Sequence, residues 1–242
     1  MMNPFTTVPK ALDLYFTVSR YNRHKKEFDK LRAEGRIEEE KALINKYQRE
    51  FIEDFSARVK LTYDITGEEN IPEQGPFMVY CNHQSYADLF ASLWLFRNHC
   101  QMGYVAKEEW RKFRFLSLAI EYSRSIFLIR HNPREAVKAI NEAKALLDQG
   151  FNMLIFPEGT RSRRHEMGDF KHGAFKFAEK AKVPVLPITF DGGYKLLEET
   201  GSYHPCTVKI TVHPLVHLEQ MSKSEQKEAE AQIEAAIRSA LD

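Results

Sequence analysis

The sequence of 242 residues has few cysteines, few glycines and prolines, and almost no excess of one charge. Its three cysteines, Cys81, Cys100 and Cys206, are odd in number and lack metal-ligand spacing, which indicates reduced thiols, not a disulfide framework or a zinc site. Eleven glycines and ten prolines are too few for a fibrous chain, and 12% aromatic residues exclude a natively disordered one. The formal net charge of +1 gives no reason to expect a nucleic-acid partner.

Long apolar segments are also missing from the sequence. No run approaches the roughly 18–20 consecutive apolar residues that a membrane-spanning helix needs. The first ten residues, MMNPFTTVPK, lack the charged and then apolar pattern of a secretory signal. We therefore expect a cytoplasmic protein that neither spans a membrane nor is exported, but that can lie on a membrane surface.

Residues 1–58 are predicted to form an N-terminal helical hairpin. An apolar and aromatic stretch, Ala11–Val18, is followed by basic residues, Gly35 breaks the helical pattern, and a second helix is predicted from Ile37 to Arg58. The hairpin can pack on the core, or it can anchor the protein at a membrane interface with its basic residues near anionic headgroups. The first 36 residues hold eight basic and four acidic residues, an excess that favours the anchor without excluding the packed pair.

From residue 59 to residue 242 short strand-like runs alternate with helical stretches. One helix is marked by Asn132 as its N-cap and by Gly150 after its end, and the spacing of Ser222 and Glu225 predicts a capping box that opens a final helix. The predicted strands are 60–65, 76–81, 102–106, 125–129, 152–156, 185–190 and 207–212. This alternation predicts an α/β domain whose function lies at the carboxyl ends of the strands.

The most informative polar segment follows the predicted strand 76–81, where residues 82–88 read NHQSYAD. If Ser85 caps the next helix, Asp88 lies in its first turn and its carboxylate can reach back to His83. A carboxylate bonded to one ring nitrogen fixes the tautomer and leaves the other nitrogen as a base. Ser85 and Asp88 also have the spacing of a capping box, so the residues alone leave open whether Asp88 serves the imidazole or the helix.

Cationic residues follow three other predicted strands. Lys107 and Arg130 each come at the end of a strand, and residues 156–162 after a third strand read FPEGTRS. The glycine at position 159 permits close backbone approach, and the guanidinium of Arg161 suits bidentate phosphate binding. A lone basic residue at a turn is usually a surface group, but a His–Asp pair together with three cations indicates a hydroxyl that is deprotonated beside a bound phosphate.

The segments NHQSYAD and FPEGTRS, in this order and spacing, resemble the 1-acylglycerol-3-phosphate acyltransferases, the lysophosphatidic acid acyltransferase family. FKHGA at 170–174 matches the stretch after the family's Pro-Glu-Gly motif, and VPVLPI at 183–188 resembles its fourth motif. The resemblance spans residues 71–189, about half of the chain. It implies a single glycerolipid-acyltransferase-like α/β domain, with a mainly parallel or mixed central sheet flanked by helices, after the N-terminal hairpin.

The resemblance implies transfer of a fatty acyl group to the free hydroxyl of 1-acylglycerol-3-phosphate, giving phosphatidic acid. His83 is then the general base, and Asp88 orients it. The residues implied in binding the acceptor are Lys107, Arg130, Glu158, Gly159, Thr160 and Arg161. No metal and no cofactor are implied, because the oxygen attacks the thioester of acyl-CoA or acyl-carrier protein directly.

The same resemblance names a lysophospholipid and an acyl thioester as the expected partners. Because the acceptor and product are lipids and the first 36 residues carry a basic excess, we also expect contact with the anionic surface of a membrane, with the protein peripheral on the cytoplasmic face. Three other functions stay open. One is acyl transfer to glycerol-3-phosphate or to another lysophospholipid. Another is a metal-dependent phosphohydrolase with His83 and Asp88 as ligands, although the histidines at 131, 165 and 172 have basic neighbours that disfavour a cation. The last is a peripheral lipid-binding module without catalysis.

Overall fold

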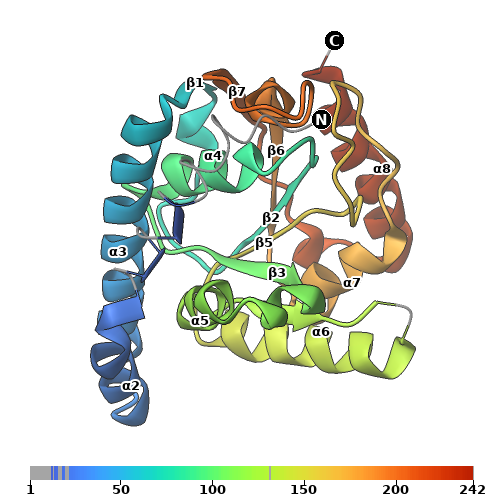
Figure 1. The fold of residues 1–242 in the computed structure, drawn as a ribbon. Helices are drawn as coiled ribbons and strands as arrows, with labels where there is room; N and C mark the ends of the chain where they lie inside the picture. The colour runs from blue at the N-terminus through green and yellow to red at the C-terminus, as the bar shows by residue number, and fades with distance from the viewer. Residues whose placement is uncertain (1–11, 13, 16–17, 20–21, 131, 242) are drawn as a thin grey trace.

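The computed structural model describes residues 12, 14–15, 18–19, 22–130 and 132–241 (Figure 1). Seven strands within these residues form one sheet in the order β1-β7-β6-β2-β5-β3-β4. The strands are β1 (Thr62–Thr66), β2 (Met78–Cys81), β3 (Gly103–Lys107), β4 (Ile126–Leu128), β5 (Met153–Ile155), β6 (Val185–Asp191) and β7 (Thr207–Val212). All neighbours are parallel except β6 and β7, so the predicted mixed α/β sheet is confirmed.

Helices cover both faces of this sheet. In Figure 1, α3 runs along one side of the molecule, while α7 and α8 lie on the opposite side. The α-helices are α2 (Lys25–Ala33), α3 (Ile37–Val59), α4 (Ala87–Phe96), α5 (Arg114–Tyr122), α6 (Pro133–Asp148), α7 (His172–Ala181) and α8 (Lys223–Ser239). Short 3-10 helices are η1 (Asn22–His24), η2 (Glu68–Asn70), η3 (Glu108–Lys112), η4 (Gly193–Leu196) and η5 (Leu218–Gln220).

The helix signals read from the sequence are confirmed. The side chain of Asn132 accepts hydrogen bonds from the backbone N–H groups of residues 134 and 135, with Pro133 at the first position of α6. At the start of α8 both bonds of the capping box between Ser222 and Glu225 are present. These caps satisfy N–H groups that a helix start leaves without intrahelical partners, which fixes where each helix begins.

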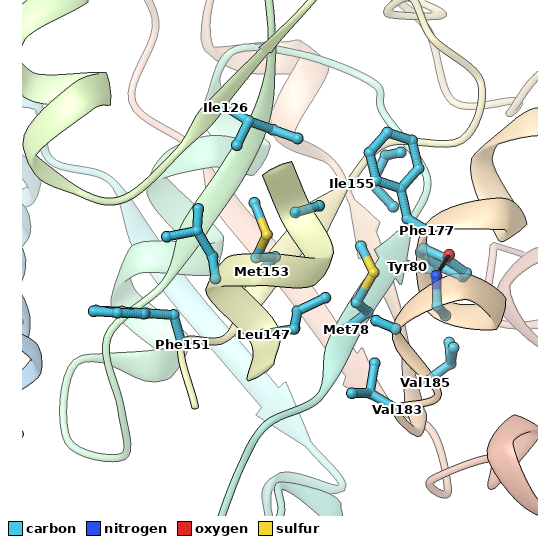
Figure 2. Packing of buried hydrophobic residues seen from close by; sticks show 14 of the residues in the cluster. Met78, Tyr80, Ile126, Leu147, Phe151, Met153, Ile155, Phe177, Val183 and Val185 are labelled. Atoms are coloured by element: carbon cyan, nitrogen blue, oxygen red, sulfur yellow. Dashed lines mark hydrogen bonds between the residues drawn. The ribbon is translucent and has the colours of Figure 1, made fainter. Parts of the chain in front are cut away.

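Side chains of the central strands alternate between two buried clusters, one on each face of the sheet. On one face Met78, Tyr80 and Met153 pack with α6, α7 and α8 (Figure 2). On the other face Val79 and Leu154 pack with α4 and the second half of α3. Because successive side chains of a strand point to opposite faces, a strand buried on both faces is apolar throughout, as β2 and β5 are.

The hairpin predicted for the N-terminal region is present as α2 and α3, with Gly35 at a φ of +65° in the turn between them. Phe28 of α2 and Ile44 of α3 lie in the first cluster, and Phe55 lies in the second. The described part of the hairpin is thus packed on the core, which is one of the two interpretations that the sequence left open. The helix α3 contributes to both clusters and is continuous with the core of the α/β domain.

A buried carboxylate joins this hairpin to the sheet. Glu40 of α3 is 1% exposed, and its Oε1 accepts hydrogen bonds from Arg32 Nε at 2.6 Å and Arg124 Nε at 2.8 Å. Its Oε2 accepts a third from Arg124 Nη2 at 2.7 Å. Since Arg32 belongs to α2 and Arg124 lies just before β4, one side chain connects three parts of the fold.

The apolar stretch Ala11–Val18, predicted as the membrane end of an anchor, falls partly outside the described residues. Leu12 and Tyr15 are described and are 50% and 46% exposed, whereas Val18 is buried. Among the helices that the structure describes, none combines the length and apolar character that crossing a bilayer requires.

Candidate active site

The polar segments singled out in the sequence meet at one edge of the sheet. Strands β2 to β6 are mutually parallel, so their carboxyl ends lie on the same side. His83 follows β2, Lys107 is the last residue of β3, Arg130 follows β4, and the segment 156–161 follows β5. The carboxyl end of β6 adds Asp191 to this edge. The sheet topology therefore brings together segments that are up to about one hundred residues apart in sequence.

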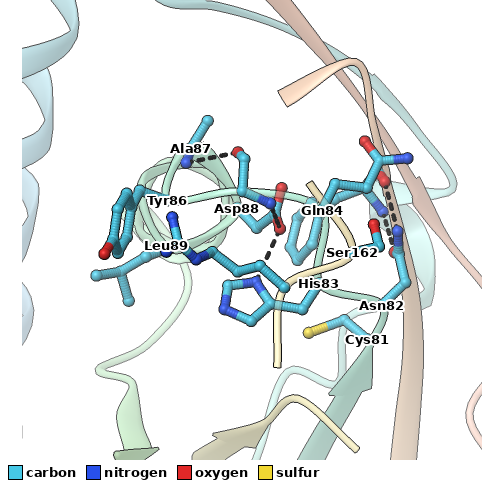
Figure 3. Close-up of polar contacts among 12 residues, drawn as sticks. Cys81, Asn82, His83, Gln84, Tyr86, Ala87, Asp88, Leu89 and Ser162 are labelled. Carbon is cyan, nitrogen blue, oxygen red and sulfur yellow. Dashed lines mark hydrogen bonds and ion pairs between the residues drawn. The ribbon is translucent and has the colours of Figure 1, made fainter. Parts of the chain in front are cut away.

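His83 and Asp88 form the predicted pair. The Nδ1 atom of His83 lies 2.9 Å from Oδ2 of Asp88, and Figure 3 shows the imidazole turned toward the carboxylate. The same Oδ2 accepts a hydrogen bond from the backbone N–H of Ser85 at 2.8 Å, and Asp88 is fully buried. Asp88 thus serves the loop at the start of α4 and the imidazole at once, which answers the question that the sequence left open.

The imidazole of His83 is oriented on a second side by an aromatic ring. Its plane stacks on Phe156, with the ring centroids 3.9 Å apart. With Nδ1 donating to Asp88, Nε2 keeps its lone pair, and no hydrogen-bond partner for Nε2 exists among the described residues. The His83 side chain is 16% exposed. A neutral imidazole held in this way has the position and the tautomer of a general base.

Glu158 lies beside this pair and faces the backbone. Its Oε1 accepts a hydrogen bond from the backbone N–H of His83 at 2.5 Å, and its Oε2 accepts one from the N–H of Gly168 at 2.7 Å. The side chain is buried, and burial raises the pKa of Glu158 to about 7 against these two hydrogen bonds. Both carboxylate oxygens of Glu158 accept hydrogen bonds from the protein backbone, and one of these bonds holds the segment that carries His83.

Two cationic residues, Arg130 and Lys171, lie beside Gly159. A Cβ atom at Gly159 would lie 3.5 Å from Nη2 of Arg130 and 3.2 Å from Cε of Lys171, and Gly159 has a φ of +71°. The pKa of Lys107 is lowered, first by burial and then by the positive charge of Arg130. Burial also lowers the pKa of Arg130. Lys107 and Arg130 are thus two partly buried cations with mutually unfavourable charge, and with Lys171 beside Gly159 they suit an anion.

Arg161 has partners that the sequence did not predict. Its guanidinium lies over the ring of Tyr86, 3.5 Å from the centroid, and its Nη1 donates to Oε1 of Glu198 at 2.7 Å. Glu198 is 5% exposed, and burial raises its pKa. Arg161 therefore belongs to the predicted cationic group, but one of its donors is held by a carboxylate. Thr160 is exposed beside it.

Gln84 is a residue of this region that sequence reasoning missed. Its buried side chain donates from Nε2 to the carbonyl of His165 at 2.7 Å and to Oδ1 of Asp191 at 3.1 Å. Its Oε1 accepts a hydrogen bond from the N–H of Gly192 at 3.0 Å. Its position inside NHQSYAD was the available signal. Lys171, inside FKHGA, carried a similar signal, whereas Glu198 stands in no motif.

Backbone bonds complete the connection between the two main loops. The N–H of Ser162 donates to the carbonyl of His83 at 2.8 Å, and the N–H of Arg163 donates to the carbonyl of Gln84 at 3.0 Å. The loop after β5 is thus bonded to the loop after β2 along the His83 segment. No three His, Cys, Asp or Glu side chains among the described residues are grouped as metal ligands.

Comparison with known proteins agrees with this geometry. The family model described as Acyltransferase matches residues 62–191, more than half of the chain. The chain belongs to the acyltransferase family. The crystal structure of the 1-acyl-sn-glycerophosphate (LPA) acyltransferase PlsC from Thermotoga maritima superposes on this acyltransferase with a TM-score of 0.75, at 27% identity, covering 97% of this chain and 94% of that one.

Curated relatives of this acyltransferase come from plants, bacteria and animals. The 1-acyl-sn-glycerol-3-phosphate acyltransferase of Pseudomonas aeruginosa is 31% identical over 66% of this chain and 61% of its own length. The chloroplastic enzyme BAT2 of Brassica napus is 32% identical over 64% of this chain and 45% of its own. The alpha enzyme of Homo sapiens is 34% identical over 61% and 53%. The matched region spans about half the length of most of these relatives. The family resemblance predicted from the sequence motifs is confirmed.

Proposed function

We propose that this protein transfers a fatty acyl group from an acyl thioester to the free hydroxyl of 1-acylglycerol-3-phosphate, giving phosphatidic acid. The observation that carries the proposal is the His83–Asp88 pair, 2.9 Å apart, at the same sheet edge as the cations around Gly159. A base oriented beside an anion site fits an acceptor that carries both a hydroxyl and a phosphate. The names of the relatives, all 1-acylglycerol-3-phosphate acyltransferases, support the same acceptor.

The reaction uses His83 twice. Its Nε2 removes the proton of the acceptor hydroxyl as the oxygen attacks the carbonyl carbon of the thioester, and the resulting imidazolium is stabilised by Asp88. When the tetrahedral intermediate collapses, the carbon–sulfur bond breaks and the imidazolium returns the proton to the departing thiolate. No acyl-enzyme is needed. Cys81, the nearest thiol in sequence, is fully buried, and burial raises its pKa well above the ordinary value, so it is a poor nucleophile.

The phosphate of the acceptor binds the cations at the ends of β3 and β4. Arg130 and Lys171 lie near Gly159, whose missing side chain leaves the backbone open to the ligand, and Lys107 is close enough to Arg130 to feel its charge. Arg161 also contributes to phosphate binding, and Glu198 and Tyr86 hold its guanidinium in place. Glu158 acts indirectly, by accepting a hydrogen bond from the backbone N–H of His83. This division assigns phosphate binding to side chains on three different loops.

The protein works as a peripheral protein on the cytoplasmic face of a membrane. Its acceptor and its product are lipids, so the active site must meet a bilayer. The basic excess of the first 36 residues and the exposure of Leu12 and Tyr15 support contact with anionic headgroups by this end of the chain. The free thiols of Cys81, Cys100 and Cys206 fit a reducing compartment.

The test is an acyl-transfer assay with the purified chain and a panel of acceptors. Lysophosphatidate, glycerol-3-phosphate and lysophosphatidylcholine are offered with radiolabelled acyl-CoA or acyl-carrier protein. We expect phosphatidic acid from lysophosphatidate, with the same rate in excess EDTA. Faster acylation of either other acceptor would reassign the substrate. Phosphate release that stops in EDTA would support a metal-dependent phosphohydrolase, and absence of all turnover would support a lipid-binding module.

A further inference from the structure

Three aromatic side chains form a continuous strip beside the candidate active site. The ring centroids of Tyr86 and Trp110 are 6.1 Å apart, and those of Trp110 and Phe113 are 5.8 Å apart. Tyr86 is 38% exposed and Phe113 is 51% exposed. We call these three residues the aromatic strip. Large apolar groups that are exposed together in this way mark a surface that binds a partner.

The aromatic strip begins at the candidate phosphate site. The guanidinium of Arg161 lies on the ring of Tyr86, 3.5 Å from its centroid. From there the contacts lead through Trp110 in η3 to Phe113, the residue before α5. The strip therefore connects a group that we assign to the acceptor's phosphate with the outer surface of the molecule.

Basic side chains border the outer end of the strip. Arg111, Lys112 and Arg114 are all exposed, and no acidic residue lies between positions 110 and 114. Arg111 is paired with Glu108 at 2.9 Å and with Glu121 at 3.6 Å. Among the described residues neither Lys112 nor Arg114 has an acidic partner. Lys112 and Arg114 therefore flank the exposed ring of Phe113 in the chain without an acidic partner among the described residues. This combination complements a bilayer with an apolar interior and anionic headgroups.

The helix that follows extends the apolar surface. In α5 Leu116 and Ile120 lie three and seven residues after Phe113, on the same helical face. Both are only half-buried, and neither belongs to the two core clusters or to the residues packed against them. On its other side α5 adjoins the N-terminal segment, since the ring of Phe115 is 5.2 Å from that of Tyr15. The helix α5 therefore lies between this half-buried apolar face and the N-terminal end that we assign to the membrane.

We propose that the aromatic strip and the outer face of α5 form a second membrane contact, seated in the interface of an anionic bilayer and directing the mouth of the active site toward the lipid. The proposal rests on the proposed function, which requires lipid substrates. Tyrosine and tryptophan favour the headgroup level, phenylalanine and leucine lie deeper, and lysine and arginine bind anionic headgroups. The order of residues from Tyr86 to Ile120 follows this pattern.

Tryptophan fluorescence tests the contact directly, because the chain has only two tryptophans. Trp94→Phe leaves Trp110 as the sole reporter. Trp110→Phe leaves Trp94, which stacks on Tyr63 with centroids 4.7 Å apart and lies six residues along α4 from Asp88. We expect phosphatidylglycerol vesicles with brominated acyl chains to quench Trp110 and to leave Trp94 unquenched. Equal quenching of both, or of neither in vesicle-bound protein, would overturn the proposal.

Vesicle sedimentation with surface variants gives a second measurement. Phe113→Asp removes the most exposed ring of the strip. Phe113 is the N-cap residue of α5, a position where aspartate is favoured, so we expect the variant to fold. We expect about tenfold weaker binding to phosphatidylglycerol vesicles. Lys112→Glu with Arg114→Glu should weaken binding further at low salt, whereas the matched pair Lys223→Glu and Lys227→Glu on α8 should not. Unchanged binding by the strip variants would contradict the proposal and leave this surface to a protein partner.

Turnover separates this proposal from the proposed function. The strip variants should acylate a short-chain lysophosphatidate, offered as monomers in solution, at the rate of the unmodified protein, because none of the altered side chains belongs to the active site. Their rates on lysophosphatidate held in vesicles should fall about as far as their binding. If the unmodified protein acylates no lysophosphatidate in either form, the proposed function fails, whatever the quenching and sedimentation show.

Discussion

The carboxylate of Glu158 accepts a hydrogen bond from the backbone N–H of His83 at 2.5 Å, while its second oxygen accepts one from Gly168. The residue that the motif FPEGTRS suggests as a substrate ligand therefore bonds to the backbone of His83, the residue that we propose as the base. The two acceptor oxygens of Glu158 each satisfy one backbone N–H group, and the bond to His83 holds the loop after β5 against the loop after β2. Accurate placement of His83 depends on this contact.

The pH dependence of stability should reveal the burial of Glu158. Its pKa is raised from 4.5 to about 7 by burial, so between these values the folded protein binds more protons than the unfolded chain. The contribution of this group to the free energy of unfolding therefore declines as pH rises through that window. Glu158→Gln should remove the decline. Urea unfolding of both proteins at several pH values checks this, with the exposed Glu69→Gln as control; parallel curves for Glu158→Gln and the unmodified protein would contradict it.

Loss of the base should stop turnover in a folded protein. His83→Ala removes the only group that we assign to proton transfer, and a positioned general base contributes about 10²–10⁴-fold in rate. Asp88→Asn should also lower kcat severely, because the amide can donate to Nδ1 and so favour the wrong tautomer. Steady-state kinetics with circular dichroism of each variant checks both effects. A folded His83→Ala protein with near-normal kcat would refute the mechanism.

Removal of a phosphate-binding cation should act on acceptor affinity. Lys107→Ala and Arg130→Ala are each expected to raise the KM for lysophosphatidate, since a hydrogen bond to a charged group is worth about 1.5–3 kcal/mol. The KM for the acyl donor should change little. Lys180→Ala is the control, because Lys180 is exposed and lies near the C-terminal end of α7. A rise confined to the donor's KM would show that these cations bind the thioester substrate instead.

Arg161→Ala is expected to differ from these two variants. It leaves the buried Glu198 without its ion partner, so a loss of stability should accompany the rise in KM. Adding Glu198→Gln should restore part of the stability and none of the acceptor affinity. Thermal unfolding and kinetics of the single and double variants separate the two roles. Equal stability of Arg161→Ala and the unmodified protein would show that the pair has no structural role.

Most of the fold was predictable because its signals are local. The central strands are short apolar runs, and two helix starts carry their own caps, at Asn132 and Ser222. Each of the seven predicted strands appears within two residues of its expected ends. The pairing of β6 with β7 in the antiparallel direction had no local signal, since it depends on how the chain returns after η4.

The site was predictable only in part, for a related reason. His83 and Asp88 are only five positions apart, across the start of α4, so their contact could be foreseen. Glu198 reaches Arg161 from a loop 37 residues away, and its role follows from tertiary packing alone. The motif indicated which residues surround Glu158 but not where its side chain points, because its partners are backbone N–H groups, which every residue except proline supplies.

The buried Glu40 should be the most sensitive polar position outside the active site. It is 1% exposed and accepts three hydrogen bonds from Arg32 and Arg124, so Glu40→Ala leaves two guanidinium groups without their carboxylate. Removing one partner of a buried ion pair costs about 3–5 kcal/mol, and the cost should fall on the contact between the hairpin and the sheet. Urea unfolding measures the loss, with the exposed Glu39→Ala, which pairs with Arg36, as the matched control. Equal stability of the two variants would mean that apolar packing alone holds α2 and α3 on the core. A large loss at Glu40 only would show that the ion cluster helps to fasten the N-terminal hairpin to the α/β domain.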